Sequence, residues 1–308
     1  MKILLTTTSF QDTPGKHHEL LKNTGFEIDE LRGPVKEEVL LPIIHKYDGV
    51  ICGDDAFTRN VIKKGKENNL KVISKYGVGL DKIDLDAAKE FDIPIHNTPG
   101  VNQITVAEHV IALIMAVLKN IPEEFAYTKN GKWKRLIGTE LYGKKVGIFG
   151  LGKIGKELAK RLSVFGVQLF AFDIDYDDNF MEKYSITKTG SVKSLIQEVD
   201  ILSINSPLTK STKGIINNEI LDNLLSEIII INTSRALIID QDALFTALKL
   251  NKIKAYITDV MDEEPMSENN TLKDLDNVYI TPHIGSRTFE SVERQGSMAV
   301  ENLIKALK

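Results

Sequence analysis

Cysteine is nearly absent from this chain of 308 residues, and neither sign of charge is in strong excess. A single cysteine, Cys52, excludes an internal disulfide and suits a reducing compartment, so we expect a cytoplasmic protein. The formal net charge of −4 argues against non-specific binding to nucleic acid or to anionic membranes. The longest apolar run, residues 110–118, is too short to span a membrane, and the N-terminal MKILLTT shows no signal-peptide pattern.

Residues 144–173 contain the most informative motif of the chain. A short apolar run ends at Phe149, and Gly150, Gly152 and Gly155 follow in G-x-G-x-x-G spacing. A helical pattern comes next, and a second apolar run ends at Asp173. The first glycine permits a tight strand-to-helix turn, the second lets backbone approach a pyrophosphate, and the third lets helix and strand pack closely.

The same stretch predicts the cofactor. The alternative is a glycine-rich turn without a ligand, but here the glycines lie between a strand and a helix, with an acid at the end of the next strand. We therefore expect a dinucleotide site in which the helix N-terminus receives the phosphates and Asp173 receives the ribose hydroxyls. A carboxylate at this place repels a 2′-phosphate, which favours NAD over NADP. No metal site is expected.

Short apolar runs alternate with amphipathic segments along the whole chain. This alternation predicts an α/β fold with two Rossmann-like, doubly wound parallel-sheet domains. The expected strands are residues 2–7, 26–31, 49–53, 71–77 and 93–97, and then 146–149, 168–172, 201–205, 227–232, 255–259 and 278–280. Helices are expected at 16–23, 85–90 and about 286–307.

Between the two sets of strands lies a segment that suggests an interface. Thr105 and Glu108 have the spacing of a capping box, so a helix is expected to begin at Thr105. Its body is apolar nearly all round and is expected to be buried between domains or subunits, with His109 as a buried or boundary histidine. Residues 121–141, which include Trp133, are polar and are expected to form an irregular arm that packs on a second subunit or on its own.

Three further stretches with polar side chains fall at predicted strand ends. They are NTSR with Arg235, DVMDEEP with Asp259 and Glu264, and TPHIGS with His283. An arginine there can hold a carboxylate, and a histidine can exchange the proton that accompanies hydride transfer, supported by a glutamate. Taken singly, Arg235 could be a structural ion-pair partner, Glu264 part of a solvated acidic run, and His283 a turn residue.

These motifs together make the chain resemble the D-2-hydroxyacid dehydrogenase family. The similarity includes GLGKIGKELAKRLSVFG, NTSR, DVMDEEP, TPHIGS, KYGVGLDKIDLDAA and GVNQITVAEHV, and it covers nearly the whole chain. The resemblance implies a discontinuous, flavodoxin-like substrate domain at 1–98 and 284–308 and an NAD-binding domain at 99–283. It also implies a homodimer or a dimer-based oligomer. Two departures stand out: Ala236 replaces a common glycine, and Asn205 replaces a common histidine.

The resemblance also implies roles for individual residues. Arg235, Glu264 and His283 would be catalytic, with Arg235 on the substrate carboxylate and carbonyl and His283 as the general acid–base. The substrate side would be completed by Lys75, Val78, Gly79 and Asn102. The cofactor side would comprise Gly150, Gly152, Lys153, Ile154, Gly155, Asp173, Pro207, Thr212, Thr233, Ser234, Arg235, Asp259, His283 and Gly285, with Asp259 on the nicotinamide carboxamide.

The implied reaction is hydride transfer between NAD(H) and a D-2-hydroxy acid or its 2-oxo acid. The similarity looks greatest to 3-phosphoglycerate dehydrogenase-like members, which act in serine biosynthesis, and Lys75 is then a candidate for the phosphate. Lys132, Lys134 and Arg135 could contribute from a partner subunit, although solvated surface charge is favoured for them. Glyoxylate or hydroxypyruvate reduction is the alternative. A protein of another class, a corepressor-like NAD sensor that binds peptides, is the third.

Overall fold

The computed structural model describes residues 1–225 and 227–308 and divides them into two compact units. The first unit comprises residues 1–102 and 286–308, and the second comprises residues 103–285. The boundaries expected from the sequence lie a few residues before these divisions. Each unit contains one parallel sheet, so the predicted α/β class with two Rossmann-like sheets is confirmed.

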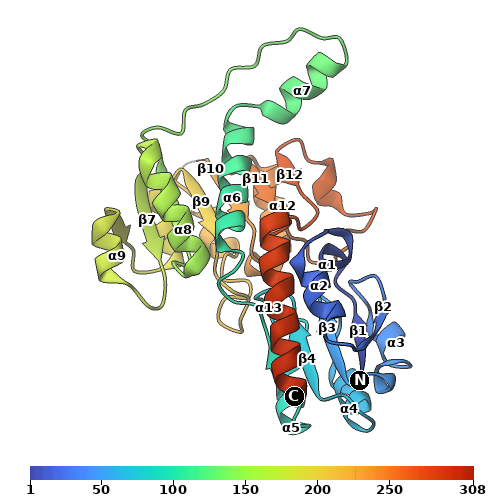
Figure 1. The fold of residues 1–308 in the computed structure, drawn as a ribbon. Coiled ribbons are helices and arrows are strands. Elements are labelled where there is room, and N and C mark those ends of the chain that lie inside the picture. Colours follow the sequence, from blue (N-terminus) through green and yellow to red (C-terminus); the bar gives the residue numbers. More distant parts are fainter. Residues whose placement is uncertain (226) are drawn as a thin grey trace. The chain divides into compact units, whose positions relative to one another are not determined.

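The first unit has a five-stranded sheet of flavodoxin-like order β2-β1-β3-β4-β5 (Figure 1). Its strands are β1 (Lys2–Leu5), β2 (Glu27–Glu30), β3 (Gly49–Cys52), β4 (Val72–Lys75) and β5 (Ile95–His96). Its helices are α1 (Thr8–Asp12), α2 (Lys16–Lys22), α3 (Glu37–Leu40), η1 (Ile44–Lys46), α4 (Arg59–Lys66), α5 (Leu85–Glu90) and α13 (Phe289–Leu307).

The C-terminal helix α13 belongs to the first unit and packs on its sheet. It packs on β3, β4 and α2, and its buried residues include Val292, Val300 and Leu303. Thr288 caps its N-terminus by accepting a hydrogen bond from the Ser291 N–H. The cap explains why the helix begins three residues after the start that the apolar pattern alone indicates.

The second unit has a seven-stranded sheet of order β12-β11-β10-β9-β6-β7-β8 (Figure 1). Its strands are β6 (Lys145–Phe149), β7 (Gln168–Phe172), β8 (Ile186–Lys188), β9 (Ile201–Ile204), β10 (Ile228–Asn232), β11 (Ile253–Thr258) and β12 (Val278–Ile280). Its helices are α6 (Gln103–Leu118), α7 (Ile121–Lys129), α8 (Lys153–Leu162), η2 (Ser163–Phe165), α9 (Asp178–Lys183), α10 (Val192–Glu198), α11 (Asn218–Asp222), η3 (Ala236–Ile238), α12 (Gln241–Lys249) and η4 (Thr271–Asp274).

The predicted strands of this unit are found, and one further strand was missed. The missed strand, β8, has three residues, of which Ile186 is buried and the other two are exposed. It lies at the sheet edge beside β7. A short edge strand with one buried residue has no apolar run for the sequence to show.

Two predictions about residues 103–141 were wrong. Helix α6 begins at Gln103 rather than Thr105, and Thr105 is buried on its inner face with Val106 and Val110. Because the side chain of Thr105 is buried within the helix, Thr105 is not the N-cap of α6. The arm is not irregular throughout, because its first part is helix α7, after which the chain runs without regular structure to β6 (Figure 1).

Among the described residues, no single helix has both the length and the composition to cross a membrane. Helices α6 and α7 meet those criteria only as a pair, with a bend of 62° between them. One face of α6 is buried in the core of the second unit, where it packs on α8. This packing accounts for its apolar composition.

Candidate functional site

The predicted site residues of the second unit follow strands of one parallel sheet. Gly150 follows β6, Asp173 follows β7, Arg235 lies just beyond β10, and Asp259 follows β11. His283 lies just beyond β12. Because the strands are parallel, their carboxyl ends share one edge of the sheet, which is where α/β proteins bind ligands.

The glycine loop leaves no room for side chains at its first and third glycines. A Cβ on Gly150 would lie 2.6 Å from the backbone nitrogen of Ser206, and the φ of Gly150 is +96°. A Cβ on Gly155 would lie 2.1 Å from the carbonyl oxygen of Gly150. Gly152, the N-cap of α8, is exposed and has no atom within 4 Å of its Cβ position. The loop therefore presents open backbone at the start of a ten-residue helix, which fits a dinucleotide pyrophosphate.

Asp173 ties this loop to the end of β7. Its carboxylate accepts hydrogen bonds from the Leu151 N–H at 2.5 Å and from the Ile174 N–H at 2.7 Å. The side chain is half-buried at the carboxyl end of β7. Lys153 and Ile154 begin α8, the first exposed and the second half-buried.

A turn after β9 and a turn after β10 are joined beside the glycine loop. Ser234 donates a hydrogen bond to the carbonyl oxygen of Ser206, and Thr212 donates one to the carbonyl oxygen of Pro207 at 2.7 Å. Asn205 donates to the carbonyl and hydroxyl oxygens of Ser203 at 3.2 Å and 3.0 Å. The asparagine that replaces the common histidine therefore helps to hold this turn.

Arg235 is the last residue of the turn between β10 and η3. Asn232 holds the turn by accepting from the Ser234 N–H and donating to the Arg235 carbonyl oxygen, both at 3.0 Å. Thr233 lies between these residues and is half-buried. Ala236 begins η3, is buried, and has no positive φ, so its Cβ is accommodated without a left-handed backbone.

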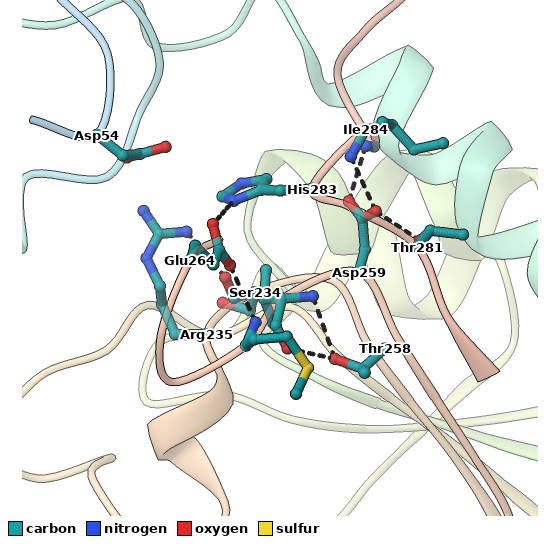
Figure 2. A network of polar contacts seen from close by, with 12 residues as sticks. Asp54, Ser234, Arg235, Thr258, Asp259, Glu264, Thr281, His283 and Ile284 are labelled. Carbon is teal, nitrogen blue, oxygen red and sulfur yellow. Dashed lines mark hydrogen bonds and ion pairs between the residues drawn. The ribbon is translucent and has the colours of Figure 1, made fainter. Parts of the chain in front are cut away.

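His283 and Glu264 form a direct pair. The Nδ1 atom of His283 lies 2.7 Å from Oε2 of Glu264, and both side chains are about one-third exposed (Figure 2). The other carboxylate oxygen, Oε1, accepts a hydrogen bond from the Met261 N–H at 2.9 Å. The glutamate is thus oriented by backbone and in turn orients the imidazole, an arrangement that is chemically able to exchange a proton.

The backbone at His283 is in the left-handed region, with a φ of +53°. This conformation is uncommon for a residue with a side chain and needs support from its surroundings. The support comes from Asp259, whose carboxylate accepts hydrogen bonds from the Ile284 N–H at 2.9 Å and the Gly285 N–H at 2.7 Å (Figure 2). A Cβ on Gly285 would lie 2.9 Å from Oδ2 of Asp259.

Asp259 is 1% exposed and also accepts a hydrogen bond from the Thr281 hydroxyl at 2.6 Å. Nε2 of His109, on α6, lies 3.5 Å from the same carboxylate. Burial opposes the charged form, but the hydrogen bonds from His109, Thr281 and the Ile284 N–H outweigh it and hold the pKa of Asp259 below its usual value. No sequence pattern indicated the contribution of Thr281. His109 was expected to be a buried or boundary residue, and it packs against this carboxylate.

The predicted substrate-side residues other than Arg235 lie in the first unit. Gly77 has a φ of +119°, and its N–H donates to the Thr98 hydroxyl at 2.8 Å. Val78 is exposed, and its carbonyl oxygen accepts a hydrogen bond from the side chain of Asn97 at 2.9 Å. Lys75 ends β4. Gly79 and Asn102 are half-buried.

Comparison with known proteins adds a second line of evidence. Residues 111–285 match the family model described as D-isomer specific 2-hydroxyacid dehydrogenase, NAD binding domain. The chain is 36% identical over 310 residues to D-3-phosphoglycerate dehydrogenase of Methanocaldococcus jannaschii, covering 100% of the chain but 58% of that relative. The chain therefore spans little more than half the length of this relative.

Two further proteins match over most of their own length. The chain is 36% identical over 286 residues to hydroxypyruvate reductase of Thermotoga maritima, covering 91% of the chain and 92% of that relative. The solved structure of the TT0316 protein from Thermus thermophilus superposes with a TM-score of 0.87 at 33% identity, covering 100% of this chain and 97% of that one. The matched family model confirms the expectation of NAD as the cofactor.

Proposed function

Because the chain belongs to the D-isomer specific 2-hydroxyacid dehydrogenase family, we propose that it interconverts a D-2-hydroxy acid and its 2-oxo acid with NAD(H). The observation that carries the proposal is the His283–Glu264 pair at the carboxyl edge of the second sheet. The glycine loop, which we assign to the dinucleotide, follows β6 at the same edge. In the reductive direction, a 2-oxo acid, a hydride and a proton combine to give the D-2-hydroxy acid. NAD(H), when bound, would supply or accept this hydride.

The chain's own residues then have separate tasks. Arg235 binds the carboxylate and the carbonyl oxygen of the acid, because a guanidinium matches two oxygens at once. His283 gives its Nε2 proton to the oxygen that becomes the hydroxyl, and takes that proton back in oxidation. Glu264 holds the imidazole by Nδ1 and stabilises its protonated form. The backbone N–H groups of Val78 and Gly79 are proposed to bind the substrate carboxylate, with Asn102 near the substrate.

The cofactor residues proposed from the sequence include those of the glycine loop that follows β6. Gly150 and Gly155 allow the close backbone packing of the loop, and Gly152 leaves open space that we assign to the pyrophosphate, with Lys153 and Ile154 proposed to lie beside it. Asp173 is proposed to bind the adenosine ribose. The residues proposed to complete the site are Pro207, Thr212, Thr233, Ser234, Asp259 and Gly285.

Asp173 provides a prediction about coenzyme choice. Replacing it by asparagine keeps one acceptor oxygen, for either the Leu151 N–H or the Ile174 N–H, and removes the charge that repels a 2′-phosphate. We expect the ratio of kcat/KM for NADPH to that for NADH to rise about tenfold, which corresponds to about 1.4 kcal/mol. Asp175→Asn, which removes an exposed neighbouring charge, is the matched control and should leave the ratio unchanged.

The proposed activity is tested by following NADH oxidation with a panel of 2-oxo acids. The panel contains 3-phosphohydroxypyruvate, hydroxypyruvate, glyoxylate, pyruvate and 2-oxoglutarate. Turnover of at least one acid with NADH is the expected result. Tight NADH binding without turnover of any acid would contradict the proposal and would favour an NAD-dependent binding protein instead.

The partners and compartment expected from the sequence belong to this proposal. We propose that the segment from α7 to β6 packs on a second copy of the chain, because it exposes Trp133, Ile137 and Phe125 by 81%, 97% and 67%. The expected solution mass is that of a homodimer or a dimer-based oligomer, measured by light scattering. Lys132, Lys134 and Arg135 lie in this segment and are exposed. We also propose a cytoplasmic location, which the single, fully buried Cys52 supports.

A further inference from the structure

His109, on α6, lies beside residues 281–285, which we call the His283 turn. In residues 106–118 of α6 the polar side chains are Glu108, which is 60% exposed, and His109, which is 16% exposed. A polar ring on the buried side of an apolar helix needs hydrogen-bonding partners. The partners of His109 lie in the His283 turn and in Asp259, all within the second unit.

His109 contacts the His283 turn on both sides of the histidine. Its Nε2 atom lies 3.4 Å from the hydroxyl oxygen of Thr281, two residues before His283. Its Cδ2 atom lies 3.4 Å from the Cβ position of Gly285, two residues after His283. Nε2 also lies 3.5 Å from Oδ1 of Asp259. The imidazole of His109 therefore connects the two ends of the turn with the carboxylate that supports it.

The hydrogen bonds of this cluster have one consistent direction. The Thr281 hydroxyl has a single proton and donates it to Oδ1 of Asp259 at 2.6 Å (Figure 2). The hydroxyl oxygen therefore accepts from His109, which places a hydrogen on Nε2 of that ring. The same carboxylate accepts from the backbone N–H groups of Ile284 and Gly285.

The charge of Asp259 makes the donor at His109 important. Burial opposes ionisation of this carboxyl, and the hydrogen bond from His109 is among those that nevertheless hold its pKa below the usual value. The ionised carboxylate accepts on both oxygens, whereas a protonated carboxyl would present an O–H to one of its donors. His109 thus favours the form of Asp259 that can bind the turn.

We propose that His109 is a positioning residue, which holds the turn in which His283 exchanges the substrate proton. The inference rests on the proposed function, because it takes His283 as the acid–base group. The φ of His283 is +53°, a conformation that needs support from its surroundings. Asp259 gives one support and His109 gives a second from a different element, α6. A small displacement of a catalytic group lowers the rate of the chemical step.

Two substitutions separate the hydrogen-bond donor of His109 from the shape of its ring. His109→Phe keeps an aromatic ring beside Gly285 but removes the donor, and His109→Gln removes the ring but keeps an N–H group of similar reach. In the full chain, kcat for 2-oxo acid reduction should fall about tenfold in His109→Phe and less than about twofold in His109→Gln. The Kd for NADH should change less than about threefold in both, because we assign the main cofactor contacts to other strand ends.

Amide hydrogen exchange tests the same support without any substrate. The N–H groups of Ile284 and Gly285 are bound by Asp259, so their exchange rates report opening of the turn. Both rates should rise about tenfold in His109→Phe and stay close to the original in His109→Gln. Amides of β6 should keep their rates in both variants, which separates opening of the turn from a loss of stability of the whole unit.

Glu108→Gln is a matched control on the same helix. Glu108 lies 3.5 Å from Arg161 of α8, so its contact is with another element, and its kcat and exchange rates should equal those of the unaltered protein. Thr281→Val serves as a second variant if His109→Phe does not fold. It removes the hydroxyl that accepts from His109, and exchange of the Ile284 and Gly285 amides should again rise.

Three results would overturn the inference. The first is unchanged exchange at Ile284 and Gly285 in folded His109→Phe or, where that variant does not fold, in Thr281→Val. The second is an equal fall of kcat and NADH affinity in His109→Phe, and the third is a kcat in His109→Gln as low as that in His109→Phe. Failure of the unaltered protein to oxidise NADH with every acid would refute the proposed activity instead, and the exchange rates, which need no substrate, keep the two failures apart.

Discussion

Replacing His283 by asparagine is expected to lower kcat for 2-oxo acid reduction about 100- to 10,000-fold, the usual contribution of a positioned acid–base group. Asparagine keeps a polar side chain beside Glu264 but cannot deliver a proton to the developing hydroxyl. The Kd for NADH should change less than about threefold, because we assign the main cofactor contacts to the glycine loop and Asp173, which follow other strands than His283. Stopped-flow or steady-state kinetics and fluorescence titration with NADH measure the two quantities separately.

His18→Asn is the matched control, since it removes a partly exposed histidine of α2 in the first unit. Its kcat should equal that of the unaltered protein. Glu264→Gln should give an intermediate loss, because the amide can still contact Nδ1 but no longer stabilises the protonated ring. If kcat and NADH affinity fell by the same factor in His283→Asn, the residue would act through cofactor binding and the proton-transfer role would be wrong.

Replacing Asp259 by asparagine is expected to lower the free energy of unfolding of the second unit by about 2–5 kcal/mol. The carboxylate is buried and accepts hydrogen bonds from the Thr281 hydroxyl and from the N–H groups of Ile284 and Gly285. An amide has one acceptor oxygen, so at least one buried donor would be left facing an NH₂ group. Chemical denaturation, read by circular dichroism, measures the loss.

The same substitution should reduce activity, because Asp259 supports the backbone on the C-terminal side of His283. The backbone of His283 has a left-handed φ, and the hydrogen bonds from the Ile284 and Gly285 N–H groups to Asp259 hold the two residues that follow it. The substitution would weaken these hydrogen bonds and so the support of this conformation. Thr246→Ala is a control of similar size on α12, where the hydroxyl bonds only to the Asp242 carbonyl oxygen within the helix. Unchanged stability in Asp259→Asn would show that this carboxylate is not a support of the His283 turn.

The pKa of Asp259 adds a pH dependence to this prediction. Hydrogen bonds hold its pKa below the usual value in the folded protein, so its stabilising contribution is present above the unfolded-state pKa. That contribution is lost as the pH falls through the folded-state pKa. The stability difference between the original protein and Asp259→Asn should therefore be full near neutral pH and narrow in acid, when measured as unfolding free energy against pH.

The fold could be predicted from the sequence because short apolar strands alternate with amphipathic helices. Strand β7 and strand β12 have the bounds that were predicted for them. The wrong predictions concern segments whose local sequence is compatible with more than one structure. Thr105 has the spacing of a cap but is buried within α6, and β8 has too few buried residues to form a pattern.

The site was predicted in part for the same physical reason. Polar residues directly after apolar strands mark the ligand-binding edge of a parallel sheet, which is how Arg235, Glu264 and His283 were selected. The rule applies equally to Asp54, which follows β3 closely but lies in no recognised motif. Its pairing with Lys75 depends on the register of β3 against β4, which no local pattern encodes.

We propose that this chain takes a hydride from the D-enantiomer of a 2-hydroxy acid and, in the reverse direction, delivers a hydride to the corresponding 2-oxo acid. The most direct test is NADH formation from NAD with matched D- and L-enantiomers of glycerate and of lactate, followed by absorbance. We predict NADH formation with at least one D-acid and none above background with its L-enantiomer. Equal rates with both enantiomers, or NADH formation from the L-acid alone, would contradict the account.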